Sequence, residues 1–101
     1  MILYIDTTQS GEVIVILKKM GKIVKKIKSK NEFGSQVLLP LIEKVLRNER
    51  LKAQDLTAVE VNTGPGSYTG IKVGVAVANA LGFSLNILVN GKKIEDEINY
   101  Q

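Results

Sequence analysis

The sequence predicts an α/β domain with two main helices and a five-stranded mixed sheet, in which a three-strand antiparallel meander joins parallel strands. Roughly the first 30 residues alternate apolar runs with short turns, a pattern typical of antiparallel strands. The rest of the chain alternates two helical periods with short apolar runs, a pattern typical of helix–strand units. A length of 101 residues suits one domain with a modest core.

Three apolar segments predict the antiparallel part of the sheet. The segment 2–6 ends in the turn-forming residues DTTQSG, and the segment 12–20 follows as a second strand. A tight turn leads into a third strand over 22–30. We expect Ile23 and Ile27 on one face of this strand and its lysines on the other face, which suits the edge of a sheet.

Two helical segments, each followed by an apolar strand, predict the remainder of the domain. Apolar residues recur at three- and four-residue spacing from about Ser35 to Leu51, and Ser35 is placed to cap this helix. A strand over 56–62 follows, then a second helix to about Phe83 and a fifth strand over 86–90. A strand entered from a helix usually pairs in parallel, so we expect parallel strands here.

The chain is expected to form one domain over residues 1–101, because it contains no linker, repeat or low-complexity segment. The tail from about residue 92 is charged and weakly periodic, which fits either a short helix or a disordered end. No run of about 18 apolar residues could span a membrane, and the N-terminus lacks the pattern of a signal peptide. The sequence therefore predicts a cytoplasmic protein without a membrane partner.

Two missing residue types limit the chemistry. The sequence contains no cysteine and no histidine. Disulfides, thiol nucleophiles, zinc sites of the usual ligand types and imidazole acid–base catalysis are therefore excluded for this chain alone. Most acidic residues lie on expected helix faces, turns or the tail, and only Asp6 ends an apolar strand. No hydroxyl group has an evident base to activate it.

Seven lysines crowd the segment from 18 to 30, in a chain of net charge +4. They are Lys18, Lys19, Lys22, Lys25, Lys26, Lys28 and Lys30. One interpretation is an electrostatic surface for nucleic acid or an acidic partner. The other is an exposed edge strand that lysines protect from pairing with other sheets, and we favour this one.

The second predicted helix carries a row of small residues at four-residue spacing. The row consists of Gly70, Gly74, Ala78 and Gly82. Each interior glycine costs about 1 kcal/mol relative to alanine, so some backbone is expected to approach the row closely. The row either packs on the sheet of its own domain or forms, with part of the first helix, a seam with another subunit. We favour the seam, because a helix that is apolar almost all round needs cover on more than one side.

The loop before this helix, TGPGSYTG (63–70), has some features of a phosphate-binding loop. Its glycines expose backbone amides, and a helix begins directly after it. It is not a Walker motif, because no Gly-Lys-Ser/Thr follows at the required spacing, and it does not match GxGxxG between a strand and a helix. Phosphate binding therefore stays a minor alternative for this loop.

Three motifs, in the same order along the chain, resemble the TsaB family, also called YeaZ. The segment GPGSYTGIKVGVAVANALG (64–82) resembles that family's GPGSFTGLRIGVATAKGLA. The opening ILYIDTT (2–8) resembles its LxIDTS strand, and SQVLLPLIEKVL (35–46) is similar to its HSExLLPLI helix. The resemblance implies a single actin-like lobe of the ASKHA, ribonuclease H-like type, which agrees with the order of strands and helices expected above.

The resemblance also implies a role. TsaB is the non-catalytic partner of TsaD, and with the ATPase TsaE they place threonylcarbamoyl on the adenosine next to the anticodon of tRNAs that decode ANN codons. We therefore expect a scaffold or activating subunit that binds a TsaD-like subunit, or a second copy in a homodimer, through its two helices and reaches tRNA indirectly. The interface candidates are Leu38, Leu41, Ile42, Val45, Gly70, Gly74, Val77 and Ala78.

Two departures from these families limit the expected activity. TsaD carries metal-binding histidines where this chain has GSQVLLP (34–40), so we expect neither a metal site nor catalysis. TsaB proteins continue into a second lobe that this sequence lacks, so Asp6, Thr7 and Thr8 would form only half of a phosphate site. We expect no independent ATPase or peptidase activity, with ATP or ADP bound only within a complex. Two alternatives stay open: a nucleotide-binding half-site of an actin-like ATPase, and a tRNA-binding module that uses the lysines.

Overall fold

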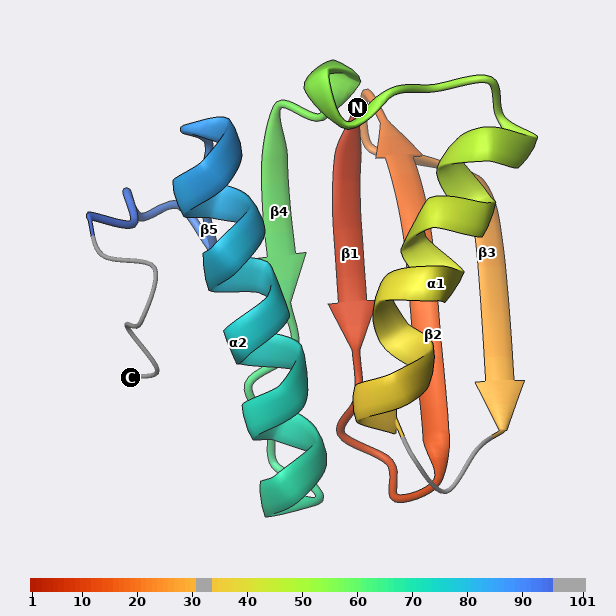
Figure 1. The fold of residues 1–101 in the computed structure, drawn as a ribbon, viewed down its shortest axis with the longest axis vertical. Helices are drawn as coiled ribbons and strands as arrows, with labels where there is room; N and C mark the ends of the chain where they lie inside the picture. Colours follow the sequence, from red (N-terminus) through yellow and green to blue (C-terminus); the bar gives the residue numbers. More distant parts are fainter. Residues whose placement is uncertain (31–33, 96–101) are drawn as a thin grey trace.

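The computed structural model describes residues 1–30 and 34–95 and confirms the mixed sheet with two helices. Along the chain the elements are β1 (Ile2–Asp6), β2 (Glu12–Lys19), β3 (Lys22–Lys30), α1 (Gly34–Asn48), the 3-10 turn η1 (Ala53–Asp55), β4 (Ala58–Val61), α2 (Tyr68–Leu85) and β5 (Leu88–Val89). The strands form one sheet in the order β3-β2-β1-β4-β5 (Figure 1). As predicted, β1, β2 and β3 pair antiparallel, and β1, β4 and β5 pair in parallel.

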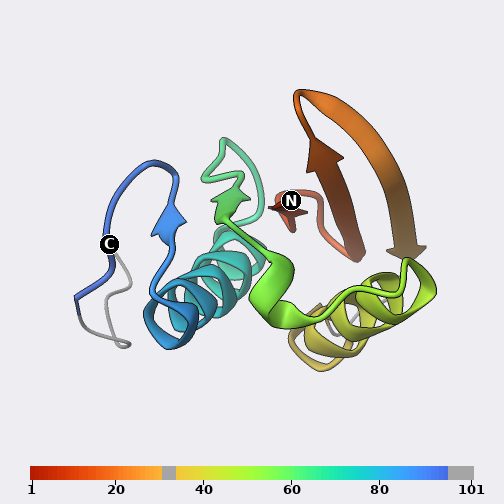
Figure 2. The ribbon, with the colours of Figure 1, turned by 90° about the horizontal axis from the view of Figure 1, so that it is seen from above.

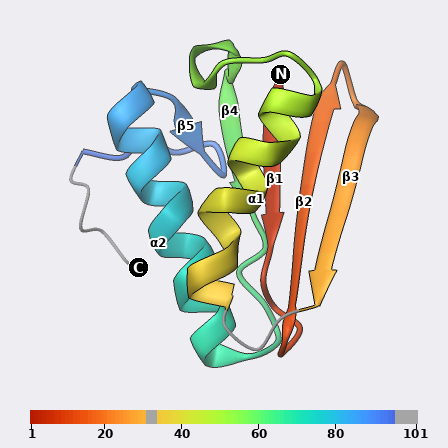
Figure 3. The ribbon, with the colours of Figure 1, turned by 45° about the vertical axis from the view of Figure 1, so that its right-hand side comes forward.

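Both helices lie on the same face of the sheet, so the core forms on one side of it (Figure 2). α1 packs on β2 and α2 packs on β4 (Figure 3). Because side chains alternate along a strand, Leu3 and Ile5 of β1 point toward the helices and are fully buried. Leu38 and Val45 of α1 are buried in the same cluster. Within residues 1–30 and 34–95, no helix covers the opposite face of the sheet.

β3 forms an edge of the sheet, as its lysine-rich sequence predicts, but its two faces differ from the prediction. Its register with β2 shifts between Leu17 and Lys18, so that Val24 is passed over in the pairing. Such a bulge reverses the side to which the following side chains point. Ile23 is accordingly 60% exposed, whereas Ile27 packs against the core. The prediction that these two isoleucines share a face is wrong.

The ends of three elements also differ from those expected. α1 begins at Gly34, so Ser35 lies in the first turn and does not cap the helix from outside. α2 continues to Leu85 and ends at Asn86, whose left-handed backbone (φ 55°) is a common way to close a helix. β5 contains only Leu88–Val89, because the chain leaves the sheet soon after pairing with β4.

The tail expected from about residue 92 is described only in part. Residues 92–95 are not helical, and Lys92 forms an isolated antiparallel bridge with Val89. The rest of the predicted tail lies outside the described residues. None of the helices that the structure describes is both long and apolar enough to cross a membrane.

Candidate functional site

The row of small residues on α2 faces the sheet of its own chain. A Cβ atom added at Gly74 would overlap the Thr7 hydroxyl and contact Val61. A Cβ at Gly70 would overlap the Thr7 carbonyl oxygen, and a Cβ at Gly82 would overlap the Val89 side chain. The close approach that the glycines permit is therefore between α2 and the sheet of its own chain. Of the two interpretations of this row, the structure supports packing within the domain.

Most residues expected at an interface are consequently part of the core. The buried ones are Leu38, Leu41, Ile42, Val45, Gly74 and Ala78. Gly70 is half-buried and turned to Thr7, and Val77 is half-buried at the edge of the core. The six buried residues are packed in the core of this lobe and are not expected to contact a partner, whereas the half-buried Val77 stays a candidate. A docking surface on these helices has to use the residues that point outward.

The outward side of α2 is apolar in its middle part and carries the exposed polar residues Thr69 and Ser84 toward its ends. Its inward side is defined by five buried residues: Gly74, Val75, Ala78, Asn79 and Gly82. With 3.6 residues per turn, the opposite side carries Val73, Ala76, Val77 and Ala80, which we call the outer row. Ala80 is exposed and the other three are half-buried. The neighbouring helix is more polar outside, since Glu43, Lys44 and Arg47 are all exposed.

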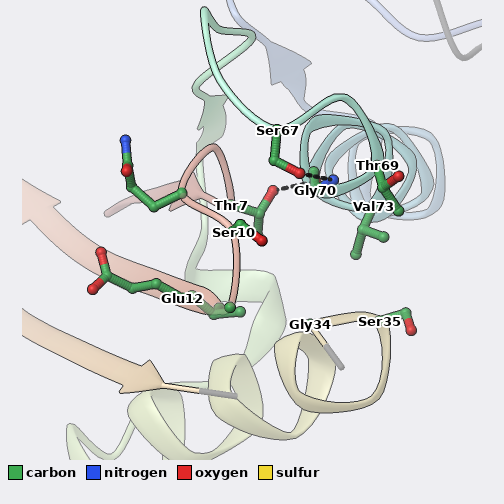
Figure 4. Close-up of a pocket in the computed structure, with 12 residues that line it drawn as sticks. Thr7, Ser10, Glu12, Gly34, Ser35, Ser67, Thr69, Gly70 and Val73 are labelled. Atoms are coloured by element: carbon green, nitrogen blue, oxygen red, sulfur yellow. Dashed lines mark hydrogen bonds between the residues drawn. The ribbon is translucent and has the colours of Figure 1, made fainter. Parts of the chain in front are cut away.

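The turn after β1 is fastened to the start of α2. The Thr7 hydroxyl donates a hydrogen bond to the Gly70 carbonyl at 2.5 Å (Figure 4), and the Ser67 amide donates to the Thr8 carbonyl at 2.7 Å. Ser67 also caps α2, because its hydroxyl accepts from the Gly70 amide at 3.2 Å. A Cβ at Gly66 would overlap Thr8. The glycines of the loop 63–70 thus serve close packing against this turn.

The carboxylate of Asp6 accepts hydrogen bonds from neighbouring residues in the same region. One carboxylate oxygen accepts from the Thr8 amide at 2.9 Å and from the Thr8 hydroxyl at 2.7 Å, and the other accepts from the Asn62 side chain at 3.3 Å. Partial burial by itself raises the pKa of Asp6, but the hydrogen bonds from Thr8 and Asn62 outweigh it and hold the pKa below its ordinary value of 3.8. Asn62 was missed from the sequence, although its place directly after β4, beside β1, could have indicated it.

A cavity of about 270 Å³ lies between the turn after β1 and the first turns of both helices (Figure 4). Thr7, Ser10, Ser35, Ser67 and Thr69 give it a lining rich in hydroxyl groups. Of the three residues expected at a phosphate half-site, Thr7 lines this cavity, whereas Asp6 and Thr8 do not. No lysine or arginine is among the described residues that line it, so nothing there supplies the positive charge that phosphates attract.

The hydroxyl of Thr7 should stabilise the fold, since it ties β1 to α2. In Thr7→Val the shape is kept but the hydrogen bond to Gly70 is lost, which costs about 1 kcal/mol for a typical bond. A thermal unfolding curve should show a Tm lower by about 4–8 °C. Thr69→Val is the matched control, because Thr69 lines the same cavity with an exposed side chain. Equal shifts in the two variants would contradict this role for Thr7.

Asp6 should make the stability depend on pH in acid. Because the folded-state pKa lies below 3.8, the ionised carboxylate stabilises the fold above about that pH, and this contribution is lost as the pH falls toward the folded-state pKa. The difference in unfolding free energy between the parent chain and Asp6→Asn should therefore shrink between pH 5 and pH 3 in urea titrations. A difference that stays constant over this range would show that the hydrogen bonds do not favour the ionised form.

The described residues offer binding surfaces and no evident reactive centre. They contain no group of three or more His, Cys, Asp or Glu side chains that could hold a metal ion. The hydroxyl groups around the cavity lie beside one carboxylate, Glu12, which forms an ion pair with Lys28 at 3.1 Å.

A β3-β2-β1-β4-β5 sheet with two helices on one face, and a turn after β1 that is fastened to α2, defines a single actin-like lobe. The family model described as TsaD, tRNA N6-adenosine threonylcarbamoyltransferase, matches residues 14–91, which include both helices. The chain therefore belongs to the TsaD family, and the expected resemblance to TsaB (YeaZ) proteins is confirmed.

Individual relatives agree with this assignment. The chain is 35% identical over 92 residues to the tRNA threonylcarbamoyladenosine biosynthesis protein TsaB of Buchnera aphidicola subsp. Schizaphis graminum, covering 89% of this chain and 42% of that protein. It is 34% identical over 89 residues to TsaB of Bacillus subtilis, covering 88% of this chain and 39% of that protein. Proteins named tRNA N6-adenosine threonylcarbamoyltransferase also match.

A solved structure of YeaZ from Pseudomonas aeruginosa superposes on the lobe with a TM-score of 0.79 at 25% sequence identity. The match covers 87% of this chain and 41% of that one. The chain thus spans about two fifths of the length of these TsaB and YeaZ proteins and about a fifth of the length of the named transferases.

Proposed function

We propose that this chain is a non-catalytic scaffold or activating subunit in tRNA threonylcarbamoyladenosine biosynthesis. It would bind a TsaD-like catalytic subunit through the outward sides of α1 and α2, and it would reach tRNA through that complex, which a TsaE-like ATPase completes. One observation carries the proposal: the two helices lie side by side on one face of the sheet, and the side of α2 that points away from the sheet carries the outer row, in which Ala80 is exposed and the other three residues are half-buried.

The outer row suits the close approach of another helix. Ala76 and Ala80 have short side chains, and Val73 and Val77 flank them. Small side chains at a contact let two helices pack near the short end of the usual interaxial distance of about 8–10 Å. A partner with an actin-like lobe can present a matching pair of helices, so that four helices exclude water together. The charged residues exposed on α1 would then set the orientation and the choice of partner.

A supporting role fits the chemistry of the chain better than a catalytic one. The sequence provides neither histidine nor cysteine, and Asp6 is held by Thr8 and Asn62. The hydroxyl-lined cavity presents no basic side chain to a phosphate among the described residues. We infer that ATP or ADP binds only where a partner supplies the missing charges.

The proposal is tested by reconstituting the modification. The chain is combined with TsaD-like and TsaE-like proteins from the same source, unmodified tRNA, ATP and the threonylcarbamoyl donor, and modified adenosine is measured by mass spectrometry of the digested tRNA. Modification should depend on the chain and on the TsaD-like protein together. Full modification without the chain, or modification by the chain without the TsaD-like protein, would refute it.

A further inference from the structure

We propose that the β2–β3 hairpin binds the phosphate backbone of a folded RNA directly. Between residues 12 and 30 the hairpin carries seven lysines and a single acidic residue, Glu12. Its positive charge exceeds the net charge of +4 of the whole chain, so the rest of the chain is net negative. Charge separated in this way within a small domain creates a local positive potential that attracts polyanions.

The lysines of β3 lie along both faces of the strand, because Lys25 is paired with Leu17 on the helix side and Lys26 and Lys28 point to the opposite side. Side chains two positions apart on a strand point to the same side and lie about 6.6–6.8 Å apart. Lys26 and Lys28 are such a pair, and they lie opposite Ile16 and Ile14 on the sheet face that the helices leave uncovered. Since β3 is the edge strand, nothing else in the described sheet lies beyond it. A nine-residue strand extends about 26 Å, which lets several phosphates be contacted in succession.

Only part of this charge is neutralised within the described residues. Lys18 pairs with Glu60 and Lys28 pairs with Glu12, each at 3.1 Å. The exposed lysines of the hairpin that form no ion pair with a described acidic residue are Lys19, Lys22, Lys25, Lys26 and Lys30. The first four of these surround the hairpin turn and the bulge, and they are free to contact phosphates.

An RNA partner fits the hairpin better than a lipid surface. Met20 at the turn is 91% exposed, and an exposed apolar tip could also contact a membrane. Lys19 and Lys22 flank that tip, but the lysines continue along β3 as far as Lys30. A phosphodiester chain can follow the whole strand, whereas a membrane would contact mainly the turn. This inference does not rest on the helix-mediated docking proposed above, because the hairpin and the outer row are separate surfaces.

The test measures binding of the purified chain to a fluorescently labelled, unmodified tRNA transcript by anisotropy over a range of KCl concentrations. With four phosphate contacts, log K should fall with log salt at a slope of about −3. The variant with Lys19, Lys22, Lys25 and Lys26 all changed to glutamate should bind at least tenfold more weakly, with a slope close to zero. The same four positions changed to arginine should bind as the parent does.

The matched control changes Lys44, Lys52, Lys92 and Lys93 to glutamate, which alters the net charge equally outside the hairpin. This control should retain binding within about threefold, because screened charges beyond about 10 Å contribute little. Equal losses in the two glutamate variants would overturn the proposal, since net charge alone would then explain binding. Absence of tRNA binding by the parent chain would overturn it, as would hairpin-dependent binding to phosphatidylserine vesicles without tRNA binding.

The glutamate variant also separates RNA binding from edge protection and from docking. It keeps the edge strand charged, so it should stay monodisperse in light scattering while RNA binding is lost. It should also still bind a TsaD-like partner, because the outer row is intact. Loss of partner binding with tRNA binding unchanged in this variant would contradict the assignment of the hairpin.

Discussion

Gly74→Leu is expected to destabilise the domain by about 1–3 kcal/mol or more, the usual range for side chains forced into a packed core. The new side chain would have to enter the space held by the Thr7 hydroxyl, with Val61 and Ile5 directly behind it. The higher helix propensity of leucine recovers less than about 1 kcal/mol. For a domain of this size, thermal unfolding followed by circular dichroism should show a Tm lower by about 10–20 °C.

Ala80→Leu is the matched control for this prediction. Ala80 lies on the same helix but is exposed on the outer row, so leucine meets no part of the sheet there. Its Tm should stay within a few degrees of the parent value. The opposite pattern, a stable Gly74→Leu chain that no longer forms complexes, would show that the glycine row is a seam between subunits and not part of the core.

Ala80→Arg should abolish or strongly weaken binding to a TsaD-like subunit without unfolding the lobe. The proposed contact would bury a long, charged side chain between closely packed helices, and an unpaired buried charge costs several kcal/mol. A loss of about 3 kcal/mol corresponds to a Kd about a hundredfold higher. Calorimetric titration of the partner into the parent chain and into the variant measures this change.

Met20→Arg provides the control for charge. It adds the same charge on the β2–β3 turn, where Met20 is 91% exposed. Partner binding should be unchanged in this variant, and circular dichroism should confirm that both variants are folded. If Ala80→Arg binds the partner as tightly as Met20→Arg does, the outer row is not the docking surface.

Local sequence patterns were sufficient for most of the fold. The continuous apolar runs of β1 and β2, the turn at Gly21 and the three- and four-residue spacing in α1 each specify an element through neighbouring residues alone. The lysine-rich sequence of β3 also predicted its position at the edge of the sheet, because lysines on a strand favour solvent on at least one side. The family motifs added the actin-like arrangement, which the sheet order confirms.

Long-range contacts decided what the sequence left open. α2 is apolar on nearly every side, so its periodicity does not indicate which side faces the sheet, and glycines four apart fit either a core or a seam. The deciding contact joins Thr7 to Gly70 across 63 positions of the chain. The bulge that skips Val24 likewise depends on how two strands pair and on no feature of β3 alone.

The central claim is that this lobe acts by binding a TsaD-like subunit through its helices. The most direct test is the solution mass, from light scattering on a size-exclusion column, of the chain alone and after mixing with the TsaD-like protein from the same source. We predict a mixed complex of defined mass, which forms whether the chain alone is a monomer or a homodimer. Separate elution of the two folded proteins at concentrations well above micromolar would contradict the claim.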